Sequence, residues 1–177
     1  MEEMRKAVLF LDDEENILNA LRRALRKEGY QLFFCLTPED ALRILDTERV
    51  DIIFTDYLMP QMTGLEFVKI ARELHPGAMR CILTGQADLE IAVDAINQGQ
   101  VHRFLLKPWN DLELKVTLKQ LFLQRELESA NKSLTDTIDQ QRVRIVALEQ
   151  QHPGISEVSR DEAGVIVLED VKLGRTG

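Results

Sequence analysis

The sequence predicts a doubly wound α/β fold on a five-stranded parallel sheet, followed by a long C-terminal helix or coiled coil and a short β-hairpin. Three observations predict it. Five short, largely apolar runs alternate with amphipathic segments over residues 1–110. Apolar residues stand side by side within each run, which is typical of strands buried on both faces. Residues 111–151 then contain neither glycine nor proline.

The apolar runs give the expected strands, and the segments between them give the helices. The strands are predicted at residues 7–11, 31–36, 51–55, 80–84 and 103–106. Between the first two, apolar residues recur at helical spacing from Ile17 to Leu25, and Gly29 follows as a stop signal. Successive strand–helix units of this kind build a parallel sheet with right-handed crossovers.

The stretch after the last strand predicts one helix over residues 111–151. At 1.5 Å per residue such a helix is about 60 Å long, which exceeds the size of one small domain. We therefore expect three parts: a globular domain at 1–123, a helical stalk at 124–151, and a tail at 152–177 that includes a β-hairpin near 155–168.

The stalk has a heptad pattern that favours pairing of two helices. Over residues 124–148, Gln124, Asn131, Ile138 and Ile145 occupy position a, and Leu127, Leu134, Gln141 and Leu148 occupy position d. Isoleucine at a with leucine at d favours a parallel dimer, and one asparagine at a fixes its register. The alternative is an amphipathic helix that folds back on its own domain.

The overall composition excludes several classes of protein. Hydrophobic residues make up 45% of the chain and the formal net charge is −8. Neither half offers the basic face that nucleic-acid binding requires, so we expect no nucleic-acid partner. No apolar run approaches the ~20 residues of a membrane span, and the N-terminus lacks a secretory signal. We therefore expect a cytoplasmic protein whose two cysteines, Cys35 and Cys81, are buried thiols.

Polar residues occur repeatedly where the predicted strands end. These are Asp12 and Asp13 after the first strand, Asp56 after the third, Thr84 at the end of the fourth and Lys107 after the fifth. In open parallel sheets, ligands bind at the carboxyl ends of the strands. Converging carboxylates disfavour one another's ionised form, and a hard divalent cation removes that cost. The pattern therefore predicts a Mg²⁺ site.

These residue types suit phosphoryl transfer. A carboxylate such as Asp56 can attack a phosphoryl group and hold it as an acyl phosphate. The metal and Lys107 would neutralise the charge on the transferring oxygens. The hydroxyl of Thr84 could then bond a phosphate oxygen.

With these landmarks in order, the sequence resembles the receiver domains of two-component response regulators over residues 5–125. The resemblance rests on the Asp12–Asp13 pair, on DIIFTDYLMPQMTGLE around Asp56, and on the later LTG and LLKPW stretches. The segments LTGQAD and AINQGQVHRFLLKPW resemble the corresponding segments of receivers fused to HD-GYP phosphodiesterases or to hydrogenase-type transcription activators. The resemblance implies a flavodoxin-like fold and a phosphorelay function.

The resemblance also implies roles for single residues. Asp56 would be the phosphoacceptor. Asp13, Asp56 and the backbone carbonyl of Leu58 would bind Mg²⁺ directly, with Asp12 acting largely through water. Phe104 would be the switch aromatic that works with Thr84.

The same resemblance implies a cis peptide at Lys107–Pro108 and a sensor histidine kinase or phosphotransfer protein as partner. Gly85, where alanine is common, and Trp109 are minor departures from the family pattern. The chain would be a switch rather than an enzyme, with a dimeric stalk that reports its state to an effector that the sequence does not identify.

Three other functions fit the sequence less well. A structural or adaptor protein could keep this fold and work independently of phosphate, but such a protein needs none of the polar set. A phosphatase of the haloacid-dehalogenase type would need a second aspartate two residues after its nucleophile, and Leu58 stands there. Dinucleotide binding lacks its glycine-rich phosphate loop.

Overall fold

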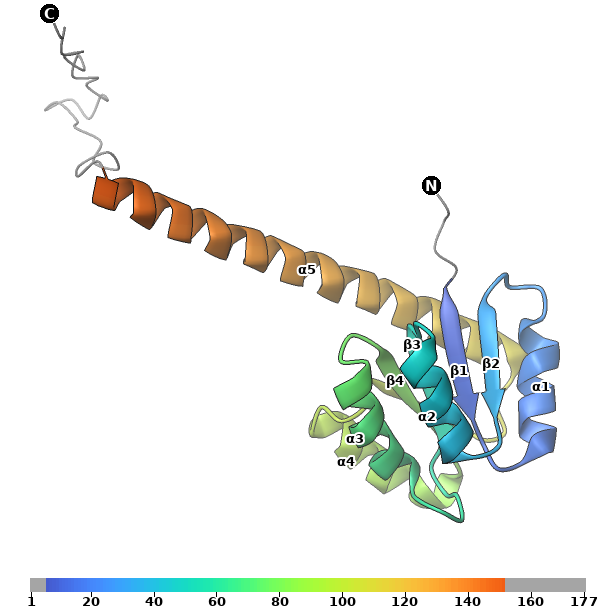
Figure 1. Ribbon diagram of the computed structural model, residues 1–177. Helices are drawn as coiled ribbons and strands as arrows, with labels where there is room; N and C mark the ends of the chain where they lie inside the picture. The colour runs from blue at the N-terminus through green and yellow to red at the C-terminus, as the bar shows by residue number, and fades with distance from the viewer. Residues whose placement is uncertain (1–5, 152–177) are drawn as a thin grey trace, which may run out of the picture. The chain divides into compact units, whose positions relative to one another are not determined.

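The computed structural model describes residues 6–151, and its first part is built on a five-stranded parallel sheet (Figure 1). Its strands are β1 (Ala7–Leu11), β2 (Gln31–Cys35), β3 (Ile52–Asp56), β4 (Met79–Thr84) and β5 (Arg103–Leu106). They are hydrogen-bonded in the order β2-β1-β3-β4-β5, and every neighbouring pair is parallel. The predicted fold class is confirmed, with strand limits shifted by one residue at most.

The three central strands are buried along their whole length, whereas the two edge strands are partly exposed. This burial explains why their sequences are apolar throughout, since both faces of a parallel sheet are covered by helices. Alternate residues of one strand point to opposite faces. In β1, Val8 and Phe10 pack on one side, while Leu9 and Leu11 pack on the other.

Helices cover both faces of the sheet. They are α1 (Glu15–Leu25), α2 (Pro38–Thr47), α3 (Gly64–Leu74), α4 (Leu89–Asn97) and α5 (Asp111–Gln151), with a 3-10 turn at Gln86–Asp88. Residues of α1 and of the first part of α5 share a core with one face, and Trp109 packs against that core. Residues of α2, α3 and α4 cover the other face.

The chain divides into two compact units, Met1–Ser129 and Ala130–Gly177. The first contains the whole sheet. Within α5 the buried side chains all precede residue 123, and the helix extends to Gln151, the last described residue. The predicted long helix is thus confirmed. The tail at 152–177, with its predicted β-hairpin, lies outside the described residues.

Candidate functional site

The predicted polar residues meet at the carboxyl edge of the sheet. Asp12 directly follows β1, Asp56 and Thr84 are the last residues of β3 and β4, and Lys107 directly follows β5. One carboxylate oxygen from each of Asp12, Asp13 and Asp56 lies within 4.8 Å of the others. The parallel order of the strands therefore brings together residues that are up to 95 positions apart in the sequence.

Lys107 bridges two of the carboxylates. Its Nζ donates to Oδ2 of Asp12 at 2.7 Å and lies 2.8 Å from Oδ1 of Asp56. Both aspartates are buried, and the lysine side chain is 17% exposed. Oδ1 of Asp12 also accepts the backbone N–H of Glu14 at 2.9 Å, which fixes the orientation of that carboxylate.

Burial and like charge act together on the carboxylates. Burial raises the pKa of Asp56, Lys107 lowers it in part, and the charge of Asp13 raises it further. The pKa of Asp12 is raised as well, by burial first, against the opposing hydrogen bond from Lys107. Burial by itself would lower the pKa of Lys107, but its bonds to the two aspartates outweigh burial, and that pKa is raised. One ammonium thus leaves three carboxylates undercompensated.

An open cavity of about 320 Å³ adjoins these groups. Four of the predicted site residues, Asp13, Asp56, Leu58 and Lys107, line it, whereas Asp12 does not. Glu14, Tyr57, Gly85 and Asp88 also line it and were not singled out as site residues beforehand. For Glu14 a signal was present, because it follows the Asp12–Asp13 pair, but Asp88 lies four residues beyond β4 and its place at the cavity depends on the loop after that strand.

The donor set fits a divalent cation. Mg²⁺ takes oxygen ligands at 2.0–2.1 Å, so opposite ligands of one ion lie about 4 Å apart. The spread of the three carboxylate oxygens is close to that span, and the excess of negative charge gives the cation an electrostatic reason to bind. Asp13 is exposed, which leaves a side open to ligand and water.

Gly64 positions the backbone of Asp56, a role that the sequence analysis did not assign. A Cβ atom at Gly64 would overlap the carbonyl oxygen of Asp56. The N–H of Gly64 donates to the carbonyl of Tyr57 at 2.8 Å, which ties the start of α3 to the end of β3. A capping box between Thr63 and Glu66 begins the helix at this point. Only glycine allows so close an approach.

Thr84 and Phe104 do not line the cavity. Thr84 is buried, and its hydroxyl donates to the carbonyl of Gly85 at 3.2 Å. The ring of Phe104 is partly buried against a small core cluster that includes Ile82 and Val101. The two residues nevertheless lie on adjacent strands, since Ile82 pairs with Phe104 and Thr84 pairs with Leu106.

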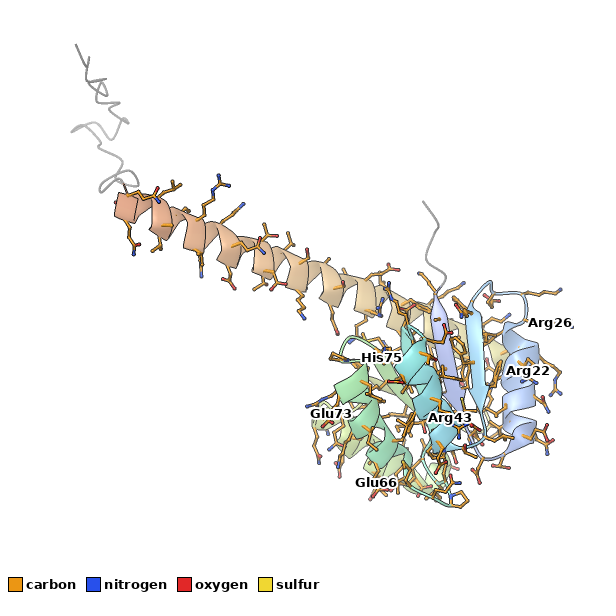
Figure 2. All side chains as sticks on the ribbon, viewed as in Figure 1. Arg22, Arg26, Arg43, Glu66, Glu73 and His75 are labelled. Atoms are coloured by element: carbon orange, nitrogen blue, oxygen red, sulfur yellow. The ribbon has the colours of Figure 1, made fainter. Side chains whose placement is uncertain are left out.

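Two further expectations concern backbone and surface. The Lys107–Pro108 peptide is cis, as the resemblance implies. Charges of both signs occur on the helices around the sheet and beside them: Arg22 lies on α1 and Arg26 directly follows that helix, whereas Glu66 and Glu73 lie on α3 (Figure 2). Among residues 6–151, no helix combines the length and the apolar character needed to cross a membrane.

Comparison with known proteins agrees with this geometry. The family model of the response regulator receiver domain matches residues 8–119 of this chain. The hydrogenase transcriptional regulatory protein HoxA of Bradyrhizobium diazoefficiens is 34% identical over 134 residues, which cover 73% of this chain and 27% of that protein. The DNA-binding transcriptional regulator NtrC of Proteus hauseri is 28% identical over 163 residues, or 90% of this chain and 34% of that protein.

Solved structures give the same result. The signal receiver domain of an HD domain-containing protein from Pseudomonas fluorescens Pf-5 is 34% identical, with a TM-score of 0.64, and covers 69% of this chain and 98% of that one. The predicted resemblance, including the likeness to hydrogenase-type regulators, is confirmed. The matched part of the chain spans only about a quarter to a third of the length of HoxA and NtrC.

Proposed function

The chain belongs to the response regulator receiver domain family, and we propose that it is a Mg²⁺-dependent switch in which Asp56 accepts a phosphoryl group. The observation that carries the proposal is the bridge of Lys107 between Asp12 and Asp56 beside an open, acidic cavity. A partly buried lysine with excess carboxylate around it suits an anionic ligand that arrives together with a cation.

The proposed reaction is an in-line displacement at phosphorus. An Oδ atom of Asp56 forms the new P–O bond, and the bond from phosphorus to the donor breaks, with its electron pair leaving on the donor. The product is an acyl phosphate. Lys107 stabilises the charge on the phosphoryl oxygens from one side. When bound, Mg²⁺ would supply further positive charge, held by Asp12, Asp13, Asp56 and the backbone carbonyl of Leu58.

The donor in this proposal is a sensor histidine kinase or a phosphotransfer protein, as for the family. The proposal includes a cytoplasmic location, where such kinases obtain ATP. In this proposal the chain has no second substrate, so it acts as a switch and not as an enzyme on other molecules. The formal charge of −8 and the mixed charges on its helices favour a protein partner over nucleic acid.

We propose that Thr84 and Phe104 report phosphorylation to the surface around α4 and β5. The hydroxyl of Thr84 now donates to the carbonyl of Gly85, and a phosphate on Asp56 offers it a charged acceptor, which forms a stronger bond. Movement of Thr84 would open space beside Phe104. Thr84→Ala should therefore accept phosphate while the amide-exchange change over residues 88–108 is lost, and an undiminished change would remove Thr84 from the mechanism.

The output that we propose is a homodimer formed through the stalk at 124–151, which would pass the signal to an effector not yet identified. The exposed side chains of Leu134 and Ile138 support it. Changing both to aspartate would place four charges in the seam, at a cost of several kcal/mol per desolvated ion. Light scattering should then report a monomer with a folded receiver. A dimer that persists would mean that other surfaces hold the two copies together.

Incubation with acetyl phosphate and Mg²⁺, followed by intact-protein mass spectrometry, tests the function. The wild-type chain should gain one phosphoryl group, and chelation of the metal should abolish the gain. Asp56→Asn should not gain it, whereas the matched control Asp46→Asn, at an exposed position of α2, should behave as wild type. If Asp56→Asn is labelled at the wild-type rate and yield, the assignment is wrong.

A further inference from the structure

α5 has an apolar face besides the one that packs against the sheet. The buried residues of the helix are Leu114, Thr117, Leu118, Leu121 and Phe122. Among the apolar side chains of the helix that remain more than half exposed, one set consists of Leu112 at 72%, Leu123 at 58%, Leu134 at 62% and Ile145 at 53%. Successive members of this set are separated by eleven residues.

A second set repeats with the same period. Val116, Leu127 and Ile138 are also eleven residues apart, and they are 42%, 58% and 50% exposed. Eleven residues fill slightly more than three helical turns, so at 3.6 residues per turn both sets lie within about 80° of the helix circumference. Together the seven side chains form one narrow apolar stripe along α5, from Leu112 to Ile145, called here the eleven-residue stripe.

We propose that a second copy of this chain covers the eleven-residue stripe, and that pairing begins at Leu112 on the receiver's own part of α5. The inference rests on the proposed dimer and names its surface. It differs from the heptad frame, which covers residues 124–148 only. That frame places Gln124 and Asn131 in the seam and leaves Leu123 outside it.

A second copy fits this stripe because a long partner must present the same period. An identical helix does so over its full length, and a symmetric pair uses one patch twice. From Leu112 to Ile145 the stripe is about 50 Å long, and a helix about 10 Å wide gives a strip on the order of 500 Å² per copy. Both copies together reach about 1,000 Å², where specific interfaces begin.

The period has a structural consequence. A heptad repeat imposes a left-handed supercoil, whereas an eleven-residue repeat gives a slight right-handed one. The helices of this dimer would thus run almost straight past each other. Leu112 is only five residues after Lys107 in the sequence. The dimer seam would therefore begin close to the proposed phosphate site, and no further element would be needed to connect the two.

Cysteine cross-linking of the full chain distinguishes the two frames. The native thiols of Cys35 and Cys81 are buried, so the wild-type chain should give no cross-link under mild oxidation. Leu123→Cys should form a covalent dimer readily, and the adjacent Gln124→Cys should form far less. A stronger cross-link from Gln124→Cys, or equal ones, would overturn the eleven-residue stripe in favour of the heptad seam.

Leu134→Cys separates failure of this inference from failure of the proposed function, because both frames place Leu134 in the seam. If it does not cross-link, the stalk dimer itself is wrong. If it cross-links while Leu123→Cys does not, the dimer stands and the stripe is wrong.

A charge test at Leu112 probes the part of the stripe that lies on the receiver. Leu112→Glu should weaken the dimer on the order of tenfold or more in sedimentation equilibrium, since it places two charges in the seam. The control Gln124→Glu should have much less effect. Leu112 is largely exposed, so the receiver should stay folded, which its thermal unfolding checks. Equal effects of both variants, or a larger effect of Gln124→Glu, would contradict the proposal.

Discussion

Asp56 ends β3 at the carboxyl edge of the sheet, and Asp51 directly precedes the same strand at the amino edge. Both side chains are buried, and each meets a cationic side chain that comes from far along the sequence. Asp56 lies 2.8 Å from Nζ of Lys107, and Asp51 lies 2.9 Å from Nη2 of Arg125 on α5. Each edge of the sheet therefore contains a buried aspartate that is paired with a cationic side chain.

The surroundings of the two aspartates differ in charge balance. Asp51 faces two guanidinium groups, since Arg49 lies 3.5 Å from the same oxygen, and its other oxygen accepts the N–H of Ala7 at 2.9 Å. Arg125 also donates to the carbonyl of Gly77 at 3.2 Å, which fastens α5 to the amino edge. The carboxyl edge instead gathers three carboxylates beside an open cavity, and one ammonium contacts two of them.

This difference in charge balance distinguishes an aspartate that stabilises the fold from the proposed phosphoacceptor. A carboxylate whose oxygens are occupied by cations and backbone N–H groups stabilises the fold. A carboxylate that has too little positive charge near it, and that borders an open cavity, destabilises the fold until a ligand compensates its charge. Excess charge at functional sites is a common source of lost stability. Four predictions test this contrast.

The largest effect is expected from Gly64→Ala, because the carboxyl edge is tightly packed behind Asp56. The added methyl group would overlap the carbonyl oxygen of Asp56 and displace it. We expect a loss of about 3 kcal/mol in the free energy of unfolding, in the upper range for overpacking, together with loss of phosphorylation. Urea unfolding gives the first value and mass spectrometry the second.

Gly77→Ala is the matched control at the amino edge. A Cβ atom at Gly77 meets no heavy atom within 4 Å, so the change should be neutral or slightly stabilising. Equal losses for both glycine variants would show that the close approach at Gly64 has no special role.

The second prediction is that Asp51→Asn destabilises the receiver. The amide would keep one acceptor but turn an N–H₂ group toward a guanidinium, most closely that of Arg125. We expect a loss of about 2 kcal/mol, less than for a fully buried pair because Arg125 is 23% exposed. Urea unfolding at neutral pH measures it. A variant as stable as the wild type would mean that Asp51 does not anchor this edge.

The third prediction is a gain in stability, for a substitution at the carboxyl edge. Asp56→Asn removes one of three converging carboxylates and leaves Lys107 paired with Asp12. Without divalent cations we expect a gain of about 1 kcal/mol in the free energy of unfolding. Adding Mg²⁺ should stabilise the wild type more than the variant. If the variant is less stable than the wild type in the presence of a chelator, the carboxyl edge is not undercompensated.

The smallest effect concerns pH at the amino edge. Nδ1 of His102 accepts the N–H of Arg80 at 3.0 Å, and burial, followed by the charge of Arg80, lowers the pKa of His102 below its usual 6.5. The unfolded chain then binds the proton more readily, so stability should fall as pH drops through 6.5 and level off below the folded pKa. The loss should be smaller than the effects of the three substitutions above.

His102→Asn keeps an acceptor for the N–H of Arg80 but does not titrate. The difference in unfolding free energy between pH 7 and pH 5 should therefore be smaller in the variant than in the wild type. An identical difference in both proteins would assign the pH dependence to other groups.

Much of the fold and site was predictable from the order of residue types. Apolar runs predicted the buried strands, and the position of Asp56 or Lys107 after a run placed each at the carboxyl edge, because strand direction is the same throughout a parallel sheet. The contact of Arg125 with Asp51 joins positions 74 apart and depends on how α5 crosses the sheet, which no local pattern encodes.

Other features depend on distances that a sequence does not contain. The role of Gly64 was not predictable, since its closeness to Asp56 follows from the loop between β3 and α3. Asp88 reaches the cavity through the 3-10 turn after β4. The exposure of Leu112 and Leu123 required the packing of α5 to be known, because either face of the helix is apolar enough to be the buried one.

Reduction of the phosphorylated chain with borohydride tests the central claim most directly. An aspartyl phosphate is reduced to homoserine, so peptide sequencing by mass spectrometry identifies the acceptor residue. We predict homoserine at position 56 after treatment with acetyl phosphate and Mg²⁺, and none at position 51, whose carboxylate is already paired. Homoserine at position 12, 13 or 51 in place of 56, in a chain that has gained a phosphoryl group, would contradict the account.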